Sequence, residues 1–479
     1  MKRLLAIALL LAACDKRPAT PPDKAEPVAK AAATEVDPCS KAHPEGGEQM
    51  PWIADDLPAA LACGAARKLP VVVDLWAPWC HTCLSMKSTV FTDPSFKPEA
   101  DKFVFVALDT DKEVNAAAVG KYPPSAWPTF YVIGPDKASG QPETVLARFV
   151  GAASVAQFHT FLDAGRKAQD GGAAGADARL LGSERAIAVK DLATAEQELD
   201  AALGQAPADW PRRPEALRAL ISTKSKRKDL AGCVALAGAR MDDTGNAAAA
   251  TDFLVIGLHC ADKLEKDDPA AADKIKALRA QAATRLAKLA DDPAAAMSID
   301  DRSDALATLR EAQDALGRHD DAKATALRQR ALLDDAAAKT TTPMAAMTYN
   351  WQRAEVYAYL GVPLEIVPAL EKSAKDLPTE YDPRARLGWV YLKADKLPEA
   401  AKWTDEALAL VYGPRKARLI AQRTEIAVKQ HDAATERKMR GELVALWQNM
   451  PAGQADPEAL DKAKQELAAL EAPAPVAGK

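Results

Sequence analysis

Residues 71–83 read VVVDLWAPWCHTC and decide how the first domain of this chain folds. The β-branched residues at the start of this stretch predict a buried strand, and the residues after it have the composition of a helix. Cys80 and Cys83 stand two residues apart at the junction between them. A pair in this position is a redox couple, half of a metal site or two buried thiols, and the rest of the chain must decide among the three.

The whole chain has 479 residues, a length that suggests two to four domains. Hydrophobic residues make up 48%, enough to fill packed cores, and the frequent alanines favour helix because alanine loses no side-chain entropy there. The formal net charge is −5, and charges of both signs are spread without a basic block. The composition therefore gives no support for binding to nucleic acid.

The chain begins with a pattern typical of an export signal. Residues 1–13 combine a basic start with an apolar core that is too short to span a membrane, so they predict a signal peptide. Residues 11–14, LAAC, resemble the lipobox of bacterial lipoproteins, which implies cleavage before Cys14 and lipidation of that cysteine. A plain signal peptide is the alternative. We expect a protein of the cell envelope, lipid-anchored and facing the periplasm, at either the inner or the outer membrane.

Composition divides the next part of the chain into three segments. Residues 14–49 are rich in proline, alanine and charge, and they predict a lipidated, disordered tether. Residues 50–167 alternate apolar runs with helical patterns, so we expect an α/β sandwich domain there. Residues 168–177 are rich in glycine and alanine and predict a linker.

Residues 178–472 contain helical patterns and no strand pattern. Tyr357 and Tyr391 occupy equivalent places in two similar units, and their separation of 34 residues is the tetratricopeptide period. We expect an α-solenoid of roughly six to eight helix pairs. An alanine-rich bundle without a true repeat is the alternative, and residues 473–479 are expected to be a disordered tail.

The stretch around the two cysteines resembles the thioredoxin signature, in which an apolar strand, Asp74 and a tryptophan precede Trp-Cys-x-x-Cys. Residues 126–129, AWPT, are similar to the later thioredoxin motif, which implies a cis peptide bond at Pro128. Residues 86–96, MKSTVFTDPSF, resemble more specifically the C-terminal periplasmic domain of the DsbD thiol:disulfide interchange proteins. The expected fold is therefore multidomain, with a thioredoxin-like α/β domain followed by an all-α TPR-like solenoid.

Physical chemistry assigns different roles to the two cysteines. Disulfide exchange needs a thiolate, and an ordinary cysteine with a pKa of about 8.5 is mostly protonated at neutral pH. Cys80 falls at the start of the expected helix, where free N–H groups stabilise an anion, so we expect it to be the exposed nucleophile. Cys83 lies one turn later and is the expected resolving thiol. Between them, His81 and Thr82 are expected to influence the redox potential and to meet the substrate.

Asp74 is the third expected catalytic residue. Its place on a buried strand should raise its pKa, and the resemblance implies that it assists proton transfer to the resolving cysteine. The lysine that usually neighbours this acid is absent from the corresponding strand, residues 105–111, FVALDTD. A structural role in the core is therefore the alternative for Asp74.

The resemblance implies that substrate binds beside the disulfide. The cis bond at Pro128 would place the backbone of Trp127 where it can pair with an extended substrate strand. Trp79 is expected to be a partly exposed flank of Cys80, whereas Trp76 is expected to lie in the core.

Other chemistries have little support in the sequence. A c-type haem needs a histidine directly after the second cysteine, and residue 84 is leucine. A zinc site needs two further ligands, and the nearest candidates, Cys39 and His43, would form a stray pair. We expect no metal and no other cofactor. The remaining cysteines, Cys39 with Cys63 and Cys233 with Cys260, are either structural disulfides or separate buried thiols.

These observations lead to two hypotheses of different classes. The first is a cell-envelope thiol–disulfide oxidoreductase of the protein-disulfide reductase or isomerase type, whose helical repeats bind a partner or client. Its partners would be proteins with thiols or disulfides, an electron donor or acceptor protein, and a membrane through the lipid anchor. The second is a TPR-type scaffold or adaptor lipoprotein in which the thioredoxin-like domain is a docking module.

Overall fold

The computed structural model describes residues 37–44, 47–136 and 140–471 of the chain. The described residues from Pro38 onward form one compact unit. The expected signal peptide, the lipidation site at Cys14 and the tail at 473–479 lie outside the described residues. Within the described part, no helix combines the length and the apolar character that crossing a bilayer requires.

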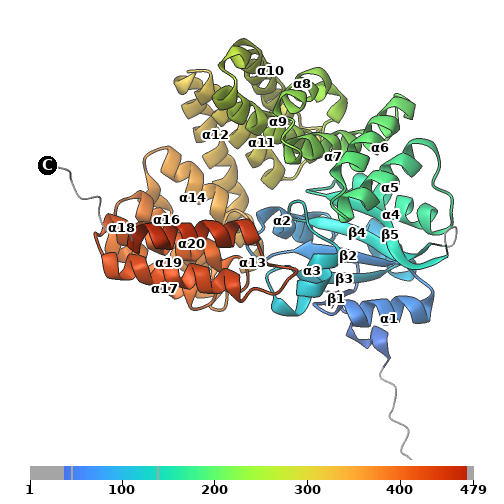
Figure 1. Cartoon of the computed structure of the whole chain (residues 1–479), viewed down its shortest axis with the longest axis horizontal. Helices are drawn as coiled ribbons and strands as arrows, with labels where there is room; N and C mark the ends of the chain where they lie inside the picture. The colour runs from blue at the N-terminus through green and yellow to red at the C-terminus, as the bar shows by residue number, and fades with distance from the viewer. Residues whose placement is uncertain (1–36, 45–46, 137–139, 472–479) are drawn as a thin grey trace, which may run out of the picture. The chain divides into compact units, whose positions relative to one another are not determined.

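A five-stranded mixed sheet forms the centre of the first domain (Figure 1). Its strands in spatial order are β1 (Trp52–Ala54), β3 (Val104–Asp109), β2 (Val71–Trp76), β4 (Thr129–Asp136) and β5 (Gln141–Val150). The first three run parallel, β4 is antiparallel to β2, and β5 is antiparallel to β4. The strand expected from the quoted stretch is thus the central one, and it is buried because helices cover both faces.

Successive residues of β2 serve two different cores. Val72 packs into a core rich in phenylalanine, which includes residues of α2 (His81–Thr89) and α4 (Val155–Gln169). Val73 packs into a second core, which includes residues of α1 (Leu57–Arg67). A pleated strand between two layers of helix requires this alternation. The expected α/β fold of the thioredoxin-like type is confirmed.

The folded part begins earlier than the sequence indicated. We expected a tether over residues 14–49, whereas Pro38–Lys41 form a 3₁₀ helix and His43 forms a bridge with the first residue of β1. A disulfide between Cys39 and Cys63 joins this segment to α1. A covalent bond and backbone pairing fix this segment, and its composition reveals neither of them. The folded part therefore starts before β1.

The described elements that follow α4 are all helical, and they pack as successive hairpins (Figure 1). Seven hairpins lie within residues 175–448: α5/α6 (Gly175–Ala188, Leu192–Gln205), α7/α8 (Arg213–Lys226, Leu230–Arg240), α9/α10 (Ala248–Asp267, Ala272–Asp291), α11/α12 (Ile299–Ala315, His319–Ala338), α14/α15 (Asn350–Tyr359, Val367–Asp376), α16/α17 (Asp382–Lys393, Leu397–Leu408) and α18/α19 (Lys416–Lys429, Ala433–Gln448). The short helix α13 (Pro343–Met347) precedes the fifth hairpin, and α20 (Pro457–Glu471) follows the last. The number of hairpins falls within the range that the sequence predicted. The all-helical region resembles a TPR solenoid.

Six of the seven hairpins turn in the same way. In each, one residue has a left-handed backbone, and the N–H of the next residue donates to the carbonyl five positions before it. The left-handed residues are Lys190, Lys228, Gly317, Gly361, Asp395 and His431. In the sixth hairpin, for example, the N–H of Lys396 donates to the carbonyl oxygen of Tyr391 at 2.9 Å. This bond satisfies a carbonyl that the end of a helix otherwise leaves free, so the repeat exists in the backbone as well as in the side chains.

Both ends of the solenoid contact the sheet domain. At the start, Glu184 of α5 accepts a hydrogen bond from the backbone N–H of Arg148 at 3.1 Å, beside the edge strand β5. At the far end, Gln454 Nε2 donates to the carbonyl oxygen of Thr110 at 2.7 Å. Gly453 packs so closely on α3 (Ala116–Lys121) that a Cβ atom there would overlap the helix backbone. Between these two contacts, α11 and α13 pack against α2.

Candidate active site

Cys80 and Cys83 form a disulfide at the N-terminus of α2, with their Cα atoms 5.2 Å apart. Cys80 is the N-cap residue, and its Sγ accepts a hydrogen bond from the backbone N–H of Cys83 at 3.0 Å. When the disulfide is reduced, this N–H and the helix dipole favour the thiolate form of Cys80. This geometry suits attack of Cys80 on a substrate disulfide and resolution of the mixed disulfide by Cys83. Both roles remain predictions. The Trp127–Pro128 peptide bond is cis.

The exposure expected for Cys80 is not observed. Cys80 is only 4% exposed and Cys83 only 2%. Three half-buried indoles, those of Trp76, Trp79 and Trp127, pack around the disulfide. The solenoid in turn packs on Trp79, and its helices α9 and α11 lie across a small cavity from Trp127. The expectation failed because a local motif predicts what starts a helix, but not what distant parts of the chain pack over it.

Trp79 is held on three sides. Its Nε1 donates to Asp111 Oδ2 at 2.7 Å, and its ring meets the ring of Trp127 edge-to-face at 5.1 Å. The guanidinium of Arg415, at the N-terminal end of α18, lies 4.2 Å from the indole centroid. Beyond it lies an apolar cluster of the solenoid that includes Tyr381. Trp79 therefore covers Cys80 and is itself fixed by the helical repeats.

His81 connects the motif to α11. Its Nδ1 lies 3.0 Å from both carboxylate oxygens of Asp300, a residue with no exposed surface. Burial alone would lower the pKa of His81, but the carboxylates of Asp300 and Asp304 raise it to about 10, against a smaller opposing effect of Arg386. The imidazole is therefore protonated at neutral pH. A positive charge therefore lies beside Cys80, and a carboxylate from the solenoid balances it.

Thr82 and Trp127 line a small cavity of about 70 Å³ on another side of the motif. The opposite wall comes from the solenoid and includes Thr251 and Asp252 of α9 and Asp304 of α11. A substrate strand that paired with the backbone beside the cis-proline would meet these helices. The expected substrate-binding edge is therefore covered in this structure.

Asp74 lies in the middle of β2 and is 2% exposed. Burial raises its pKa to about 7, and the ammonium group of Lys87 lowers it only in part. Opposite it on β3 is Ala107, so the nearby cation comes from α2 rather than from the neighbouring strand. A carboxyl group with a pKa near neutral pH is suited to proton transfer, as the catalytic prediction for Asp74 requires.

One group of side chains near the motif has the donor atoms of a cation site. Ligand atoms of His81, Asp300 and Asp304 lie within 4.8 Å of one another. With no metal bound, the raised pKa of His81 keeps the imidazole protonated at neutral pH, and a metal ion would have to displace that proton. The arrangement is therefore that of an ion pair between the two domains.

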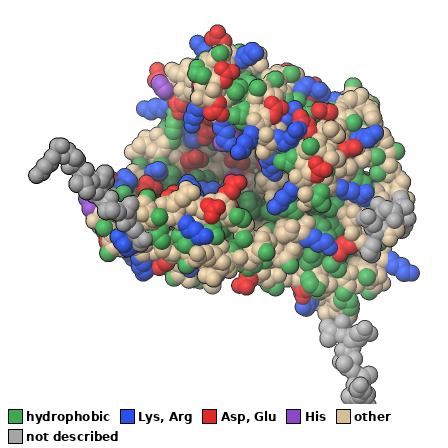
Figure 2. All heavy atoms as spheres, viewed as in Figure 1, with side chains coloured by type: hydrophobic (Ala, Val, Ile, Leu, Met, Phe, Trp, Pro, Cys, Tyr) green, Lys and Arg blue, Asp and Glu red, His purple; other side chains and the backbone are tan. Residues whose placement is uncertain are grey.

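A groove leads from the motif along the solenoid, and we call it the Trp79 groove. It has a volume of about 470 Å³. Its lining residues are Trp79, His81, Trp351, Tyr381, Asp382, Ala385, Arg386, Trp389, Leu392, Arg415, Arg418, Leu419, Ala421, Gln422 and Glu425. Figure 2 shows a hollowed region between the helical repeats and the sheet domain, with charged side chains of both signs around it. The groove therefore joins the two residues that flank Cys80 to the surface of α14, α16 and α18.

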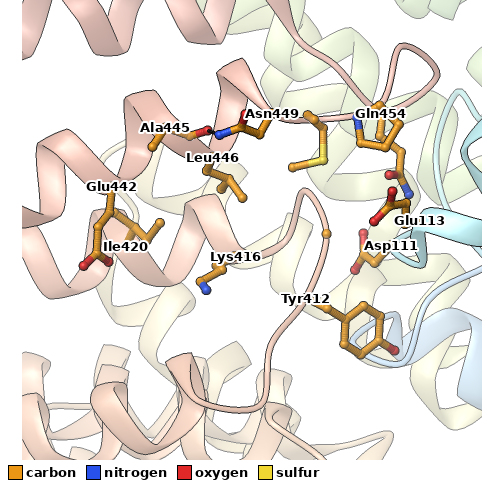
Figure 3. Close-up of a pocket in the computed structure, with 13 residues that line it drawn as sticks. Asp111, Glu113, Tyr412, Lys416, Ile420, Glu442, Ala445, Leu446, Asn449 and Gln454 are labelled. Atoms are coloured by element: carbon orange, nitrogen blue, oxygen red, sulfur yellow. Dashed lines mark hydrogen bonds between the residues drawn. The ribbon is translucent and has the colours of Figure 1, made fainter.

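A second pocket of about 580 Å³ separates the C-terminal hairpin from the sheet domain. Figure 3 shows Asp111, Glu113 and Tyr412 on one side and Ile420 and Glu442 on the opposite side. The hydroxyl of Tyr412 donates to Asp109 at the end of β3. Asp111 connects this pocket to the candidate active site, because it lines the pocket and its carboxylate accepts the hydrogen bond from Trp79 Nε1.

Sequence reasoning missed the residues that the solenoid contributes. Asp300, Asp304 and Arg415 lie more than 200 residues from the motif, and no local pattern marks them. Lys87 was missed for a different reason. The sequence places Lys87 in the helix that follows the motif. That its ammonium group acts on the pKa of Asp74 is seen only in the folded structure.

Comparison with known proteins supports the thioredoxin-like part. A sequence model described as thioredoxin-like matches residues 52–135, which include both cysteines and the cis-proline. No curated protein matches the chain.

Two solved structures are similar to the chain at low identity. A tetratricopeptide repeat protein from Parabacteroides merdae is 14% identical with a TM-score of 0.39, over 62% of this chain and 99% of that chain. The Cut9–Hcn1 hetero-tetramer of the APC/C is 13% identical with a TM-score of 0.29, over 61% of this chain and 50% of that chain. At these scores, the description of the solenoid rests on its own hairpins and turns.

Proposed function

We propose that the protein is a thiol–disulfide oxidoreductase whose Cys80–Cys83 couple exchanges electrons with the thiols or disulfides of other proteins. The observation that carries the proposal is the position of Cys80 Sγ at the N-terminus of α2, 3.0 Å from the N–H of Cys83. The thioredoxin-like match over residues 52–135 supports it. The resemblance to the periplasmic DsbD domain favours the reductase or isomerase direction.

In the reductive direction, the thiolate of Cys80 attacks a substrate disulfide and forms a mixed disulfide, and one substrate thiolate leaves. Asp74 then accepts the proton of Cys83, whose thiolate attacks the sulfur of Cys80. This step releases the second substrate thiolate and forms the Cys80–Cys83 disulfide. The substrate gains two electrons and the couple loses two, so a separate electron-donor protein must reduce the couple again.

The test is reduction of a model protein disulfide by the pre-reduced protein. We expect Cys80→Ser to abolish reduction and Cys83→Ser to accumulate a mixed disulfide that intact mass spectrometry detects. The double variant Cys233→Ser/Cys260→Ser, which removes a disulfide elsewhere in the chain, is the matched control and should retain the reaction. Equal reduction rates for the wild type and Cys80→Ser would refute the proposal.

The burial of Cys80 favours a second candidate function. With 4% of the residue exposed, the motif is positioned as an internal contact of the solenoid, as expected for a scaffold or adaptor whose thioredoxin-like domain is a docking module. Alkylation of the reduced, native protein separates the two candidates. An oxidoreductase must open often enough for Cys80 to react with iodoacetamide well before global unfolding, whereas a docking module requires no such opening.

We also propose that the protein is exported and held at the cell envelope by lipid on Cys14. Cys39–Cys63 and Cys233–Cys260 support this location, because disulfides away from a redox motif persist in oxidising compartments. Cys14→Ser should move the protein from the membrane fraction to the soluble fraction. Mass spectrometry of the wild-type N-terminus should detect acyl chains on residue 14.

A further inference from the structure

The Trp79 groove contains positive charge that the protein does not neutralise. Arg386 is paired with Asp382 at 2.7 Å, and His81 is paired with Asp300. Arg415 and Arg418 remain, and within the described residues no carboxylate lies at ion-pair distance from either guanidinium. Glu425 of α18 also lines the groove, and it forms no ion pair within the described part of the chain. One carboxylate against two arginines leaves the groove with an excess of positive charge.

Arg415 is the more unusual of the two. It is half-buried, and its guanidinium stacks on Trp79 rather than on a carboxylate. Burial lowers its pKa to about 10, the neighbouring charge of Arg386 adds to the decrease, and the more distant carboxylate of Asp382 opposes it. A cation that is partly removed from water and has no carboxylate at ion-pair distance is a favourable binding site for an anion.

The walls of the groove are aromatic. Trp351 and Trp389 meet edge-to-face at 5.1 Å, and the guanidinium of Arg386 lies 4.5 Å from the centroid of Trp351. Both indoles are half-buried, so one part of each remains open to a ligand. Flat apolar walls with cations at one end suit an extended peptide with acidic side chains better than a compact ion, because such a peptide uses both features.

Trp79 and His81, the residues on either side of Cys80, both line the groove. A substrate carboxylate can pair with the N–H groups at the edge of the Arg415 guanidinium while the face of that group stays on Trp79. A bound acidic peptide is thereby held next to an indole that packs on the disulfide.

We propose that the Trp79 groove is the substrate-binding site, and that it takes an extended peptide segment in which a disulfide-bonded cysteine is flanked by aspartate or glutamate. The acidic side chains pair with Arg415 and Arg418 while the cysteine sulfur approaches Cys80. This inference rests on the proposed oxidoreductase function, since the groove supplies the substrate to that reaction.

The test uses single-turnover reduction by the full-length, pre-reduced protein. Two synthetic peptides carry one cysteine as a neutral 2-pyridyl mixed disulfide, flanked in one by Asp and Glu and in the other by Asn and Gln. The attack of Cys80 releases 2-thiopyridone, which is followed by absorbance, and Cys83 then frees the peptide thiol. We expect the second-order rate constant to be about 10-fold higher for the acidic peptide, which corresponds to one or two charge-assisted hydrogen bonds.

Substitutions of the groove arginines test whether the preference for the acidic peptide arises in the Trp79 groove. The ratio of the two rate constants should fall toward 1 in Arg415→Gln/Arg418→Gln and part of the way in Arg418→Gln, a substitution at an exposed residue. Arg437→Gln, an exposed arginine of α19 that does not line the groove, should keep the wild-type ratio. A wild-type ratio near 1, or a ratio that Arg418→Gln and the double variant leave unchanged, overturns the groove proposal. If neither peptide is reduced, the oxidoreductase function fails, and the groove proposal fails with it.

Discussion

His81 of α2 and Asp300 of α11 form an ion pair between the two domains, with Nδ1 of His81 3.0 Å from both carboxylate oxygens. The two residues are 219 positions apart in the chain. Asp300 has no exposed surface, and the pair lies directly beside Cys80. The residue that is expected to influence the redox couple is thus also a residue that attaches the solenoid to the sheet domain.

Loss of this pair should destabilise the protein in a pH-dependent way. The pKa of His81 is raised from 6.5 to about 10, so the stabilisation is fully present below pH 6.5 and is lost as the pH rises through 10. We expect Asp300→Asn to lower the free energy of unfolding by about 3 kcal/mol at pH 6, because a buried charge loses its partner. Urea unfolding at pH 6 and pH 10 measures the difference, which should shrink at the higher pH.

The chain contains a matched control for this prediction. His319 and Asp314 also lie 3.0 Å apart, but the side chain of His319 is 75% exposed. Asp314→Asn should therefore change stability little, since water screens exposed pairs. Equal effects of the two substitutions at pH 6 would contradict the role assigned to Asp300.

Asp74→Asn should slow catalysis and stabilise the fold. Burial raises the pKa of Asp74 to about 7, so the wild type loses stability as the pH rises from 4 to 7, because the carboxyl ionises in the unfolded state while it stays protonated in the core. Asparagine carries no charge, so the variant should be more stable than the wild type at pH 8, by at most about 4 kcal/mol. Thermal unfolding at pH 4 and pH 8 tests this, and the gain should appear only at pH 8.

The catalytic effect of the same substitution appears in a different measurement. Without a base for Cys83, the mixed disulfide should resolve about 100-fold more slowly, the lower end of the range for general base catalysis. In the wild type, the rate of resolution should rise between pH 6 and pH 8 as Asp74 loses its proton. If Asp74→Asn changes neither the rate of resolution nor its pH profile, Asp74 has a structural role and no catalytic one.

The sheet and the position of the redox pair were predictable because local sequence determines them. The β-branched run of β2 alternates between two cores at Val72 and Val73, and Cys80 falls where the next helix begins. The repeat was harder to see. Its recurring turn places lysine, aspartate and histidine in the left-handed position as well as glycine, so the sequence marks only Gly317 and Gly361 clearly.

The covering of the site was not predictable from sequence. Trp79 and Arg415 stack on each other although 336 positions separate them, and neither residue lies in a pattern that indicates a partner. The contact depends on the summed curvature of the six hairpins that precede α18, which no single hairpin encodes. A motif therefore predicts the reactive atom, whereas access to that atom is a property of the whole fold.

Gly453→Ala should loosen the distal contact between the solenoid and the sheet domain. A Cβ atom at this position would overlap the carbonyl oxygen of Ala116 in α3. Moving the loop away also strains the nearby hydrogen bond from Gln454 to Thr110. We expect Cys80 of the reduced variant to react with iodoacetamide about 10-fold faster than in the wild type, as measured by mass spectrometry.

Gly441→Ala is the control for this substitution. Gly441 lies in α19, and no neighbouring atom lies within 4 Å of the place that a Cβ would occupy, so alanine should fit and stabilise the helix by about 1 kcal/mol. Its alkylation rate should equal that of the wild type. If Gly453→Ala also leaves the rate unchanged, the distal contact does not control access to Cys80.

The disulfide between Cys233 and Cys260 should contribute more to stability than the redox pair does. It joins α8 and α9 across 27 positions, whereas Cys80 and Cys83 are three apart, and the chain entropy removed from the unfolded state grows with loop length. We expect Cys233→Ser/Cys260→Ser to lower the free energy of unfolding by about 3–4 kcal/mol and Cys80→Ser/Cys83→Ser by about 2 kcal/mol or less. Urea unfolding without reductant measures both. A larger loss in the second variant would contradict this prediction, because it would mean that the redox disulfide stabilises the fold by more than the closure of its short loop.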